Sequence, residues 1–108
     1  MALTELAFTF QGQLGNTIAD DWSHTGVVGS GDLEVLMEKK EQEGHFTVRA
    51  VTPVRGYDEV WEKVLAKFAA ESGIGDVSME INDNNGTPFV VSLRLRQAWK
   101  KAKGGAER

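Results

Sequence analysis

Apolar residues alternate with polar ones in four separate segments of this chain, and this period of two is the feature that most constrains its fold. The four segments are 4–10, 33–37, 46–51 and 77–81. A strand with one buried face shows this period, because its side chains point alternately to opposite faces of the sheet. The pattern therefore predicts four strands and excludes an all-helical bundle.

Two other segments show the spacing of helices. Across 57–72 the apolar residues recur at steps of three and four, which places them on one helical face, and Gly73 can end this helix in a left-handed conformation. Residues 88–102 fit either a strand or a helix. Thr87 as an N-cap followed by Pro88 at the first helical position is a start signal, so we predict a helix over 88–102.

The connections between these elements contain turn and loop residues. Residues 11–24 are polar and show no sustained period, so we expect a long surface loop. The run 29–32 interrupts two extended pieces and places Ser30 at a bend. The charged stretch 39–44 is expected to join the second and third strands as a β-hairpin, and the turn-forming residues of 82–86 predict a tight turn.

The order of these elements indicates the fold class. Strands early in the chain, followed by helix, strand and helix, predict an α+β two-layer sandwich, with a small, mostly antiparallel sheet and two amphipathic helices on one face. With 108 residues, the chain has the size of one ordinary domain, which we expect to span 1–108. Multistep chemistry by so small a chain needs partners.

Composition narrows the classes of function. The chain has no cysteine, and therefore no thiolate zinc site and no cysteine nucleophile of its own. Its net charge of -4 argues against nucleic acid as a partner, because such binding needs a concentrated excess of Lys and Arg. The run from Arg94 to Lys103 is locally basic. The helix dipole alone favours cations near a helix C-terminus, so a docking patch is the weaker alternative.

Neither a membrane nor a metal is expected as a partner. No apolar run approaches the roughly eighteen residues of a membrane span, and the first ten residues lack the features of a secretory signal, so we expect a cytoplasmic location. His24 and His45 stand beside turn regions without partners at metal-ligand spacing, which favours solvated or hydrogen-bonding roles and no metal site. Trp61, Phe68 and Trp99 share helical spacing with other apolar residues, which predicts core packing.

Ser30 is the candidate residue for chemistry. It lies between Gly29 and Gly31, which leaves the hydroxyl without neighbouring side chains, so that a bulky transferase could reach it. The simpler interpretation is that Gly-Ser-Gly-Asp is only a turn. A serine hydrolase is poorly supported, because the run Val28 to Asp32 is not a GxSxG elbow and a base and an orienting residue would also be needed.

Four segments taken together resemble a known family. They are 26–38 (GVVGSGDLEVLME), 80–83 (EIND), 86–88 (GTP) and 90–95 (VVSLRL). Over roughly residues 24–99 the sequence resembles the acyl carrier (delta) subunit of bacterial malonate decarboxylase. It is more distantly similar to the acyl carrier (gamma) subunit of citrate lyase.

The resemblance implies a covalent prosthetic group. In these families a serine carries 2'-(5''-phosphoribosyl)-3'-dephospho-CoA through a phosphodiester, and the matching residue here is Ser30. The thiol of this arm is expected to be acetylated, malonate to displace acetate, and decarboxylation of the malonyl thioester to regenerate the acetyl form. The transferase and decarboxylase subunits perform these steps, so the chain is expected to be a non-catalytic carrier. A prosthetic-group transferase is implied as a further partner.

The residues that flank Ser30 have expected roles as well. Gly29 and Gly31 are assigned to access and bending of the chain, and Asp32 either binds the prosthetic-group transferase or only caps the turn. The chain departs from fatty-acid acyl carriers, which are helical bundles with an Asp-Ser-Leu motif, because it contains no Asp-Ser pair. Residues 1–23 do not clearly match the family. The alternative from a different class is an unmodified α+β ligand-binding or regulatory module.

Overall fold

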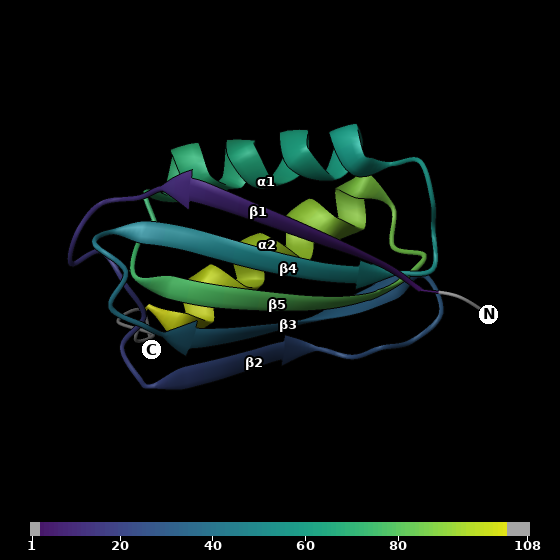
Figure 1. The fold of residues 1–108 in the computed structure, drawn as a ribbon. Coiled ribbons are helices and arrows are strands. Elements are labelled where there is room, and N and C mark those ends of the chain that lie inside the picture. The colour runs from purple at the N-terminus through teal and green to yellow at the C-terminus, as the bar shows by residue number, and fades with distance from the viewer. Residues whose placement is uncertain (1–2, 104–108) are drawn as a thin grey trace.

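The computed structural model describes residues 3–103 as a five-stranded sheet with two helices packed against it (Figure 1). In chain order the elements are β1 (Thr4–Gln11), β2 (Trp22–Gly26), β3 (Asp32–Lys39), β4 (His45–Thr52), α1 (Asp58–Ser72), β5 (Val77–Asn84) and α2 (Pro88–Ala102). Both helices lie on the same face of the sheet. The α+β class and the two-layer arrangement predicted from the sequence are confirmed.

The strands lie in the order β1-β4-β5-β3-β2. All neighbours pair antiparallel except β4 and β5, which run parallel and are joined through α1. Parallel neighbours need such a crossover, because a short turn can join only antiparallel strands. The sheet is therefore mostly antiparallel, as predicted, with one parallel pair at its centre.

The predicted β-hairpin between β3 and β4 is wrong. Strand β5 lies between them, and residues 40–44 cross over the start of β5 instead of forming a tight hairpin. One carboxylate holds this crossing in place, since Asp76 Oδ1 accepts the backbone N–H groups of Gln42 at 2.9 Å and Gly44 at 2.8 Å. The same bonds lower the pKa of Asp76, because they stabilise its charged form.

The inward-facing residues of the strands and helices form one hydrophobic core. Strands β3, β4 and β5 alternate between buried and less buried residues along their length, which confirms the period of two. From the helices, Trp61, Leu65 and Phe68 of α1 and Leu95 of α2 enter this core. Phe68 packs edge to face on Phe46 with ring centroids 5.9 Å apart. The predicted core positions Trp61 and Phe68 are confirmed.

Both helices begin and end close to the predicted positions. Helix α1 ends at Ser72, and Gly73 follows with φ 68°, the left-handed conformation that glycine adopts without a steric cost. Helix α2 starts at Pro88, after an N-cap in which the Thr87 hydroxyl accepts the Val90 N–H at 3.2 Å. The start signal therefore resolved the strand-or-helix ambiguity of this segment correctly.

The long loop expected over 11–24 is shorter and better anchored than the sequence indicates. Strand β2 already begins at Trp22, and Ile18 is 1% exposed within the core. The loop is also bound through its backbone, since Gln13 N–H donates to Gly73 O at 3.0 Å and Ala19 N–H donates to Ala102 O at 2.8 Å. It packs against the ends of both helices.

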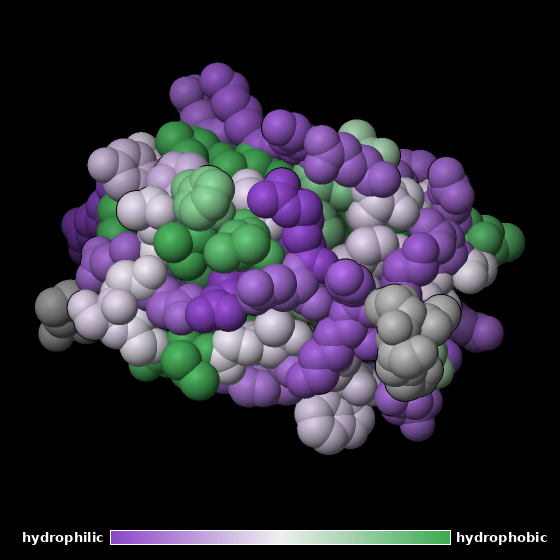
Figure 2. All heavy atoms as spheres, turned by 180° about the vertical axis from the view of Figure 1, so that it is seen from behind, coloured by the Kyte–Doolittle hydropathy of each residue, from purple (hydrophilic) through white to green (hydrophobic). Residues whose placement is uncertain are grey.

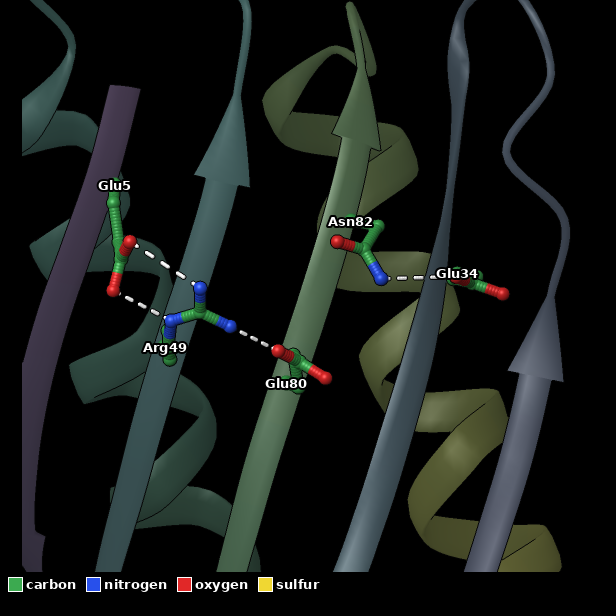
Figure 3. A network of polar contacts seen from close by, with 5 residues as sticks. All are labelled: Glu5, Glu34, Arg49, Glu80 and Asn82. Atoms are coloured by element: carbon green, nitrogen blue, oxygen red, sulfur yellow. Dashed lines mark hydrogen bonds and ion pairs between the residues drawn. The ribbon is translucent and has the colours of Figure 1, made fainter. Parts of the chain in front are cut away.

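The face of the sheet opposite the helices carries rows of polar side chains. Arg49 of β4 binds Glu5 of β1 on one side, with Nε 2.5 Å from Oε2, and Glu80 of β5 on the other (Figure 3). Asn82 Nδ2 donates to Glu34 Oε1 at 2.9 Å, which links β5 to β3. Opposite charges therefore meet across neighbouring strands, as cross-strand pairing favours.

Candidate functional site

Ser30 lies exposed in the turn that joins β2 to β3, at the end of the sheet where β5 and β4 end and both helices begin. The prediction that a bend between two extended pieces holds Ser30 is confirmed. Within residues 3–103, the Ser30 hydroxyl takes part in no hydrogen bond, so it is open to reaction.

The backbone around Ser30 is nevertheless fixed. Gly31 N–H donates to Asn84 O at 2.7 Å, which attaches the turn to the end of β5, and Asp32 N–H donates to Gly29 O at 2.9 Å. Gly31 has φ 75°, a conformation that only glycine adopts readily. A Cβ added at Gly31 would contact nothing within 4 Å, so the glycine is required by the backbone conformation and not by crowding.

Asp32, which follows the Ser30 turn, binds an arginine of α2 through its carboxylate. Arg94 Nε donates to Asp32 Oδ1 at 2.9 Å and Arg94 Nη2 donates to Oδ2 at 2.6 Å, while Leu33 N–H donates to Oδ1 at 2.7 Å. These bonds lower the pKa of Asp32 to about 2, with the Arg94 side chain as the largest cause and the Leu33 N–H next. Asp32 is thus an ionised, paired anchor of the turn.

The structure brings together Gly29, Ser30, Gly31 and Asp32, as their sequence positions require. Sequence reasoning missed two contributors, the Asn84 carbonyl and the Arg94 guanidinium. Arg94 was noted only as a member of a basic run and of the 90–95 segment of the family resemblance. No pattern in the sequence indicates that it pairs with a residue 62 positions earlier.

Exposed apolar residues lie at the same end of the molecule as Ser30. Val27 and Val28 are exposed directly before the turn, and Phe89 is exposed at the start of α2. Figure 2 shows the molecule from behind, where hydrophobic side chains gather in the left half of the view, the end where both helices begin. Ser30 therefore lies at an end of the molecule that is rich in exposed apolar surface.

A cavity of about 370 Å³ opens at this same end of the molecule. It lies between the start of α1, the turn after β5 and the start of α2. The residues that line it are Val54, Tyr57, Val60, Trp61, Val64, Asp83, Asn85, Gly86, Thr87, Pro88 and Val91. The carboxylate of Asp83 holds one wall, because Oδ2 accepts the Thr52 hydroxyl at 2.8 Å and Oδ1 accepts the Gly86 N–H at 2.9 Å.

Both histidines have hydrogen-bonding roles, as predicted. His24 Nε2 lies 2.8 Å from Glu34 Oε2, and this contact is the largest cause of the lowered pKa of Glu34. His45 Nδ1 lies 2.8 Å from Gln42 O. Across residues 3–103, His, Asp and Glu side chains form no group of three that could hold a metal ion. None of the helices in the same range is both long and apolar enough to cross a membrane.

The fold and the site define a class of protein. It is a small α+β module with an exposed serine, Ser30, on a turn that a backbone hydrogen bond attaches to the end of β5. Among the described residues, no histidine or carboxylate binds this hydroxyl as a general base would.

Comparison with known proteins places the chain in a family. Residues 21–102 match the family model described as malonate decarboxylase delta subunit (MdcD). The chain is 51% identical over 105 residues to the malonate decarboxylase acyl carrier protein of Malonomonas rubra, covering 97% of this chain and 94% of that protein. It is 45% identical over 93 residues to the protein of the same name from Xanthomonas campestris pv. campestris (strain B100), covering 86% and 89%. The chain belongs to the malonate decarboxylase delta subunit family, and the predicted resemblance is confirmed.

A solved structure supports the same assignment. The chain is similar to one chain in the crystal structure of a Pseudomonas malonate decarboxylase hetero-tetramer in complex with malonate. The TM-score is 0.77 and the sequence identity 33%, and the match covers 92% of this chain and 98% of the other. The relative from Malonomonas rubra also aligns well beyond the 24–99 range of the first resemblance.

Proposed function

We propose that this protein is the acyl carrier subunit of a malonate decarboxylase and that Ser30 is the attachment point of its prosthetic group. The observation that carries the proposal is the exposed, unbonded hydroxyl of Ser30 at the tip of a turn whose backbone is fixed on both sides. A transferase can approach such a hydroxyl without unfolding the carrier.

The residues around Ser30 fit a bulky nucleotide-type group. Gly29 and Gly31 present no side chains, and a Cβ placed on Gly29 would have only Val27 Cγ2 within 4 Å, at 3.8 Å. Attachment needs an activated phosphate donor: Ser30 Oγ loses its proton and forms a bond to phosphorus, and the bond from that phosphorus to its leaving group, such as diphosphate, breaks. The change removes no hydrogen bond of Ser30 within the described part of the chain. The group assigned here is 2'-(5''-phosphoribosyl)-3'-dephospho-CoA, carried through a phosphodiester.

The charge near the turn also suits an anionic linkage. Residues 27–31 carry no charge, and the nearest carboxylate in the sequence, Asp32, is paired with Arg94. A phosphodiester at Ser30 therefore faces a neutralised ion pair and not an isolated anion, which would repel it. The pairing with Arg94 supports a positioning role for Asp32 in the turn, the second of the two roles expected for it.

The bound group supplies a thiol on a long arm, to which acyl groups are attached as thioesters. The chain has no cysteine, so this thiol is the only one in the loaded carrier. The protein's own part is to present Ser30 and to hold the turn still while the arm moves. Its partners are the transferase and decarboxylase subunits of the complex and the prosthetic-group transferase, and no catalytic step is assigned to its own side chains.

Intact mass spectrometry of the natively purified protein tests this proposal. We expect an added mass equal to the complete prosthetic group, located on the peptide that contains Ser30. Ser30→Ala is expected to abolish the added mass, and Ser23→Ala, a change near the start of β2 and away from the turn, is expected to keep it. An unmodified chain purified from cells with active malonate decarboxylase contradicts the proposal and favours the unmodified ligand-binding module, for which the apolar cavity would be the site.

A further inference from the structure

The cavity beside the Ser30 turn has the size of a small-molecule site. Its volume of about 370 Å³ falls within the range of ligand pockets, roughly 300–1,000 Å³. Most of its lining is apolar, and two aromatic residues, Tyr57 and Trp61, contribute to it. Trp61 belongs to the buried core, whereas Tyr57 is 56% exposed at the start of α1. Aromatic surface is thus available both inside the cavity and at its rim.

The cavity lies within a short distance of Ser30. Gly86, one of its lining residues, packs against β3, because a Cβ built on Gly86 would lie 3.8 Å from the carbonyl carbon of Asp32. Two residues of extended chain from Ser30 to Asp32 span at most about 7 Å. The wall of the cavity therefore lies on the order of 11 Å from the attachment point, by the sum of these two lengths.

The charges of the lining residues indicate which group of a nucleotide arm the cavity can bind. Of the lining residues, all within the part of the chain that the structure describes, none is cationic and one, Asp83, is an acid. Beside the lining, Arg55 lies in the loop before α1 and Asp58 and Glu59 lie in its first turn, so these three neighbours carry a net negative charge. The lining offers no cationic side chain to pair with a phosphate, and the carboxylate of Asp83 would repel one. A neutral, flat group is favoured, and the side chains of Asn85 and Thr87 offer hydrogen-bond donors and acceptors to it.

We infer that this cavity binds the adenine base of the prosthetic arm. The inference rests on the proposed function, since it takes the arm on Ser30 to be a nucleotide. Adenine is the first neutral aromatic group along that arm, and the pantetheine lies beyond an anionic diphosphate. Tethering raises the effective concentration of the base near the cavity to the millimolar range. The base docks against Tyr57 and Trp61, and the thiol end of the arm stays free to reach the partner subunits.

Titration of the unmodified full-length chain with adenosine tests the site without any need for the arm. In ¹⁵N-labelled protein, we expect millimolar adenosine to shift the indole N–H of Trp61 and the amides of Gly86 and Val91 in a saturable manner. Tyr57→Ala is expected to weaken this binding about fivefold, the value of one aromatic contact. Phe89→Ala is the matched control, because Phe89 is an exposed aromatic at the start of α2 that does not line the cavity. It is expected to leave the binding unchanged.

In the naturally modified protein, the same resonances are expected to be shifted already, and added adenosine is expected to move them no further. The inference is overturned if adenosine produces no saturable shifts at the cavity, if Tyr57→Ala and Phe89→Ala behave alike, or if pantetheine shifts these resonances and adenosine does not. A chain without a group on Ser30 in the mass measurement would instead refute the proposed function, so the two failures are distinguishable.

Discussion

Arg94 holds the carboxylate of Asp32 with two of its nitrogens, and the two residues lie 62 positions apart in the chain. This bidentate contact connects the middle of α2 to the first residue of β3, directly after the Ser30 turn. Arginine suits this task because its planar guanidinium matches both oxygens of a carboxylate. The contact thus fixes one end of the turn while the Ser30 side chain remains free.

Replacing Arg94 is expected to raise the pKa of Asp32, because the Arg94 side chain is the largest cause of its lowered value. In the native protein the carboxyl of Asp32 titrates with a pKa of about 2. In Arg94→Gln, we expect its midpoint to move up towards about 4, the ordinary value for aspartate. A ¹³C NMR titration of the side-chain carboxyl measures the pKa of Asp32 in the native protein and in the variant. Arg96→Gln, a neighbouring change on the exposed side of α2, is the control, and an equal shift in both variants would contradict the assignment.

The same contact makes part of the stability depend on pH. Because the pKa of Asp32 is lower in the folded than in the unfolded chain, the unfolded chain binds more protons as the pH falls. The stabilisation is therefore complete above about pH 4 and is lost as the pH falls through about 2. Urea unfolding at several pH values is expected to show a shallower decline for Asp32→Asn than for the native protein over this window. Parallel curves would show that Asp32 contributes nothing there.

Gly31 and Gly29 are expected to respond differently to the same substitution. Gly31→Ala places a side chain at φ 75° and is expected to cost about 1–2 kcal/mol of unfolding free energy. Gly29→Ala has open space and a φ outside the left-handed region, so its cost is expected to stay below about 0.5 kcal/mol. Chemical denaturation of the two variants measures the difference. Equal stabilities would show that the turn relaxes out of its observed conformation.

Ser30→Ala is expected to leave the fold as stable as before. The hydroxyl is exposed and makes no hydrogen bond within residues 3–103, so its removal should change the unfolding free energy by less than about 0.5 kcal/mol. Thermal and urea unfolding of the unmodified proteins are the measurements. A marked drop in Tm would assign Ser30 a structural role and weaken its assignment as a free attachment point.

Asp83→Ala is expected to destabilise the wall of the cavity. The change removes the acceptor of the buried Thr52 hydroxyl and of the Gly86 N–H, and hydrogen bonds to a charged group contribute about 1.5–3 kcal/mol each. We expect a loss of about 3 kcal/mol in urea unfolding. Asn84→Ala, one position later, keeps the backbone carbonyl that binds Gly31 and is expected to cost far less. Similar losses in both variants would mean that Asp83 has no special role.

Some elements of the fold are encoded locally, and for these the sequence alone was sufficient. Strands β1, β3, β4 and β5 were recognisable because burial of one face imposes a period of two, whereas β2 begins within the predicted loop and was missed. Helix α2 was recognisable because Thr87 and Pro88 satisfy the special geometry of a helix start. The exposed Ser30 turn was predictable for the same reason, since Gly31 marks a backbone conformation that other residues avoid.

The order of the strands was decided only by the tertiary structure. Strand β5 lies between β3 and β4 because α1 returns the chain to the other end of the sheet. The residues of 39–44 contain no pattern that predicts a strand between β3 and β4. Alternation fixes which face of a strand is buried, but it says nothing about which strand lies next to it.

The contacts around Ser30 were also decided by the tertiary structure. Ser30, its glycines and the family were readable from the sequence, because a motif is contiguous and an exposed turn needs few distant contacts. The pairing of Asp32 with Arg94, and the cavity between the starts of two helices, arise only when distant segments pack together. Contacts of this kind depend on distances through space, and the sequence records only distances along the chain.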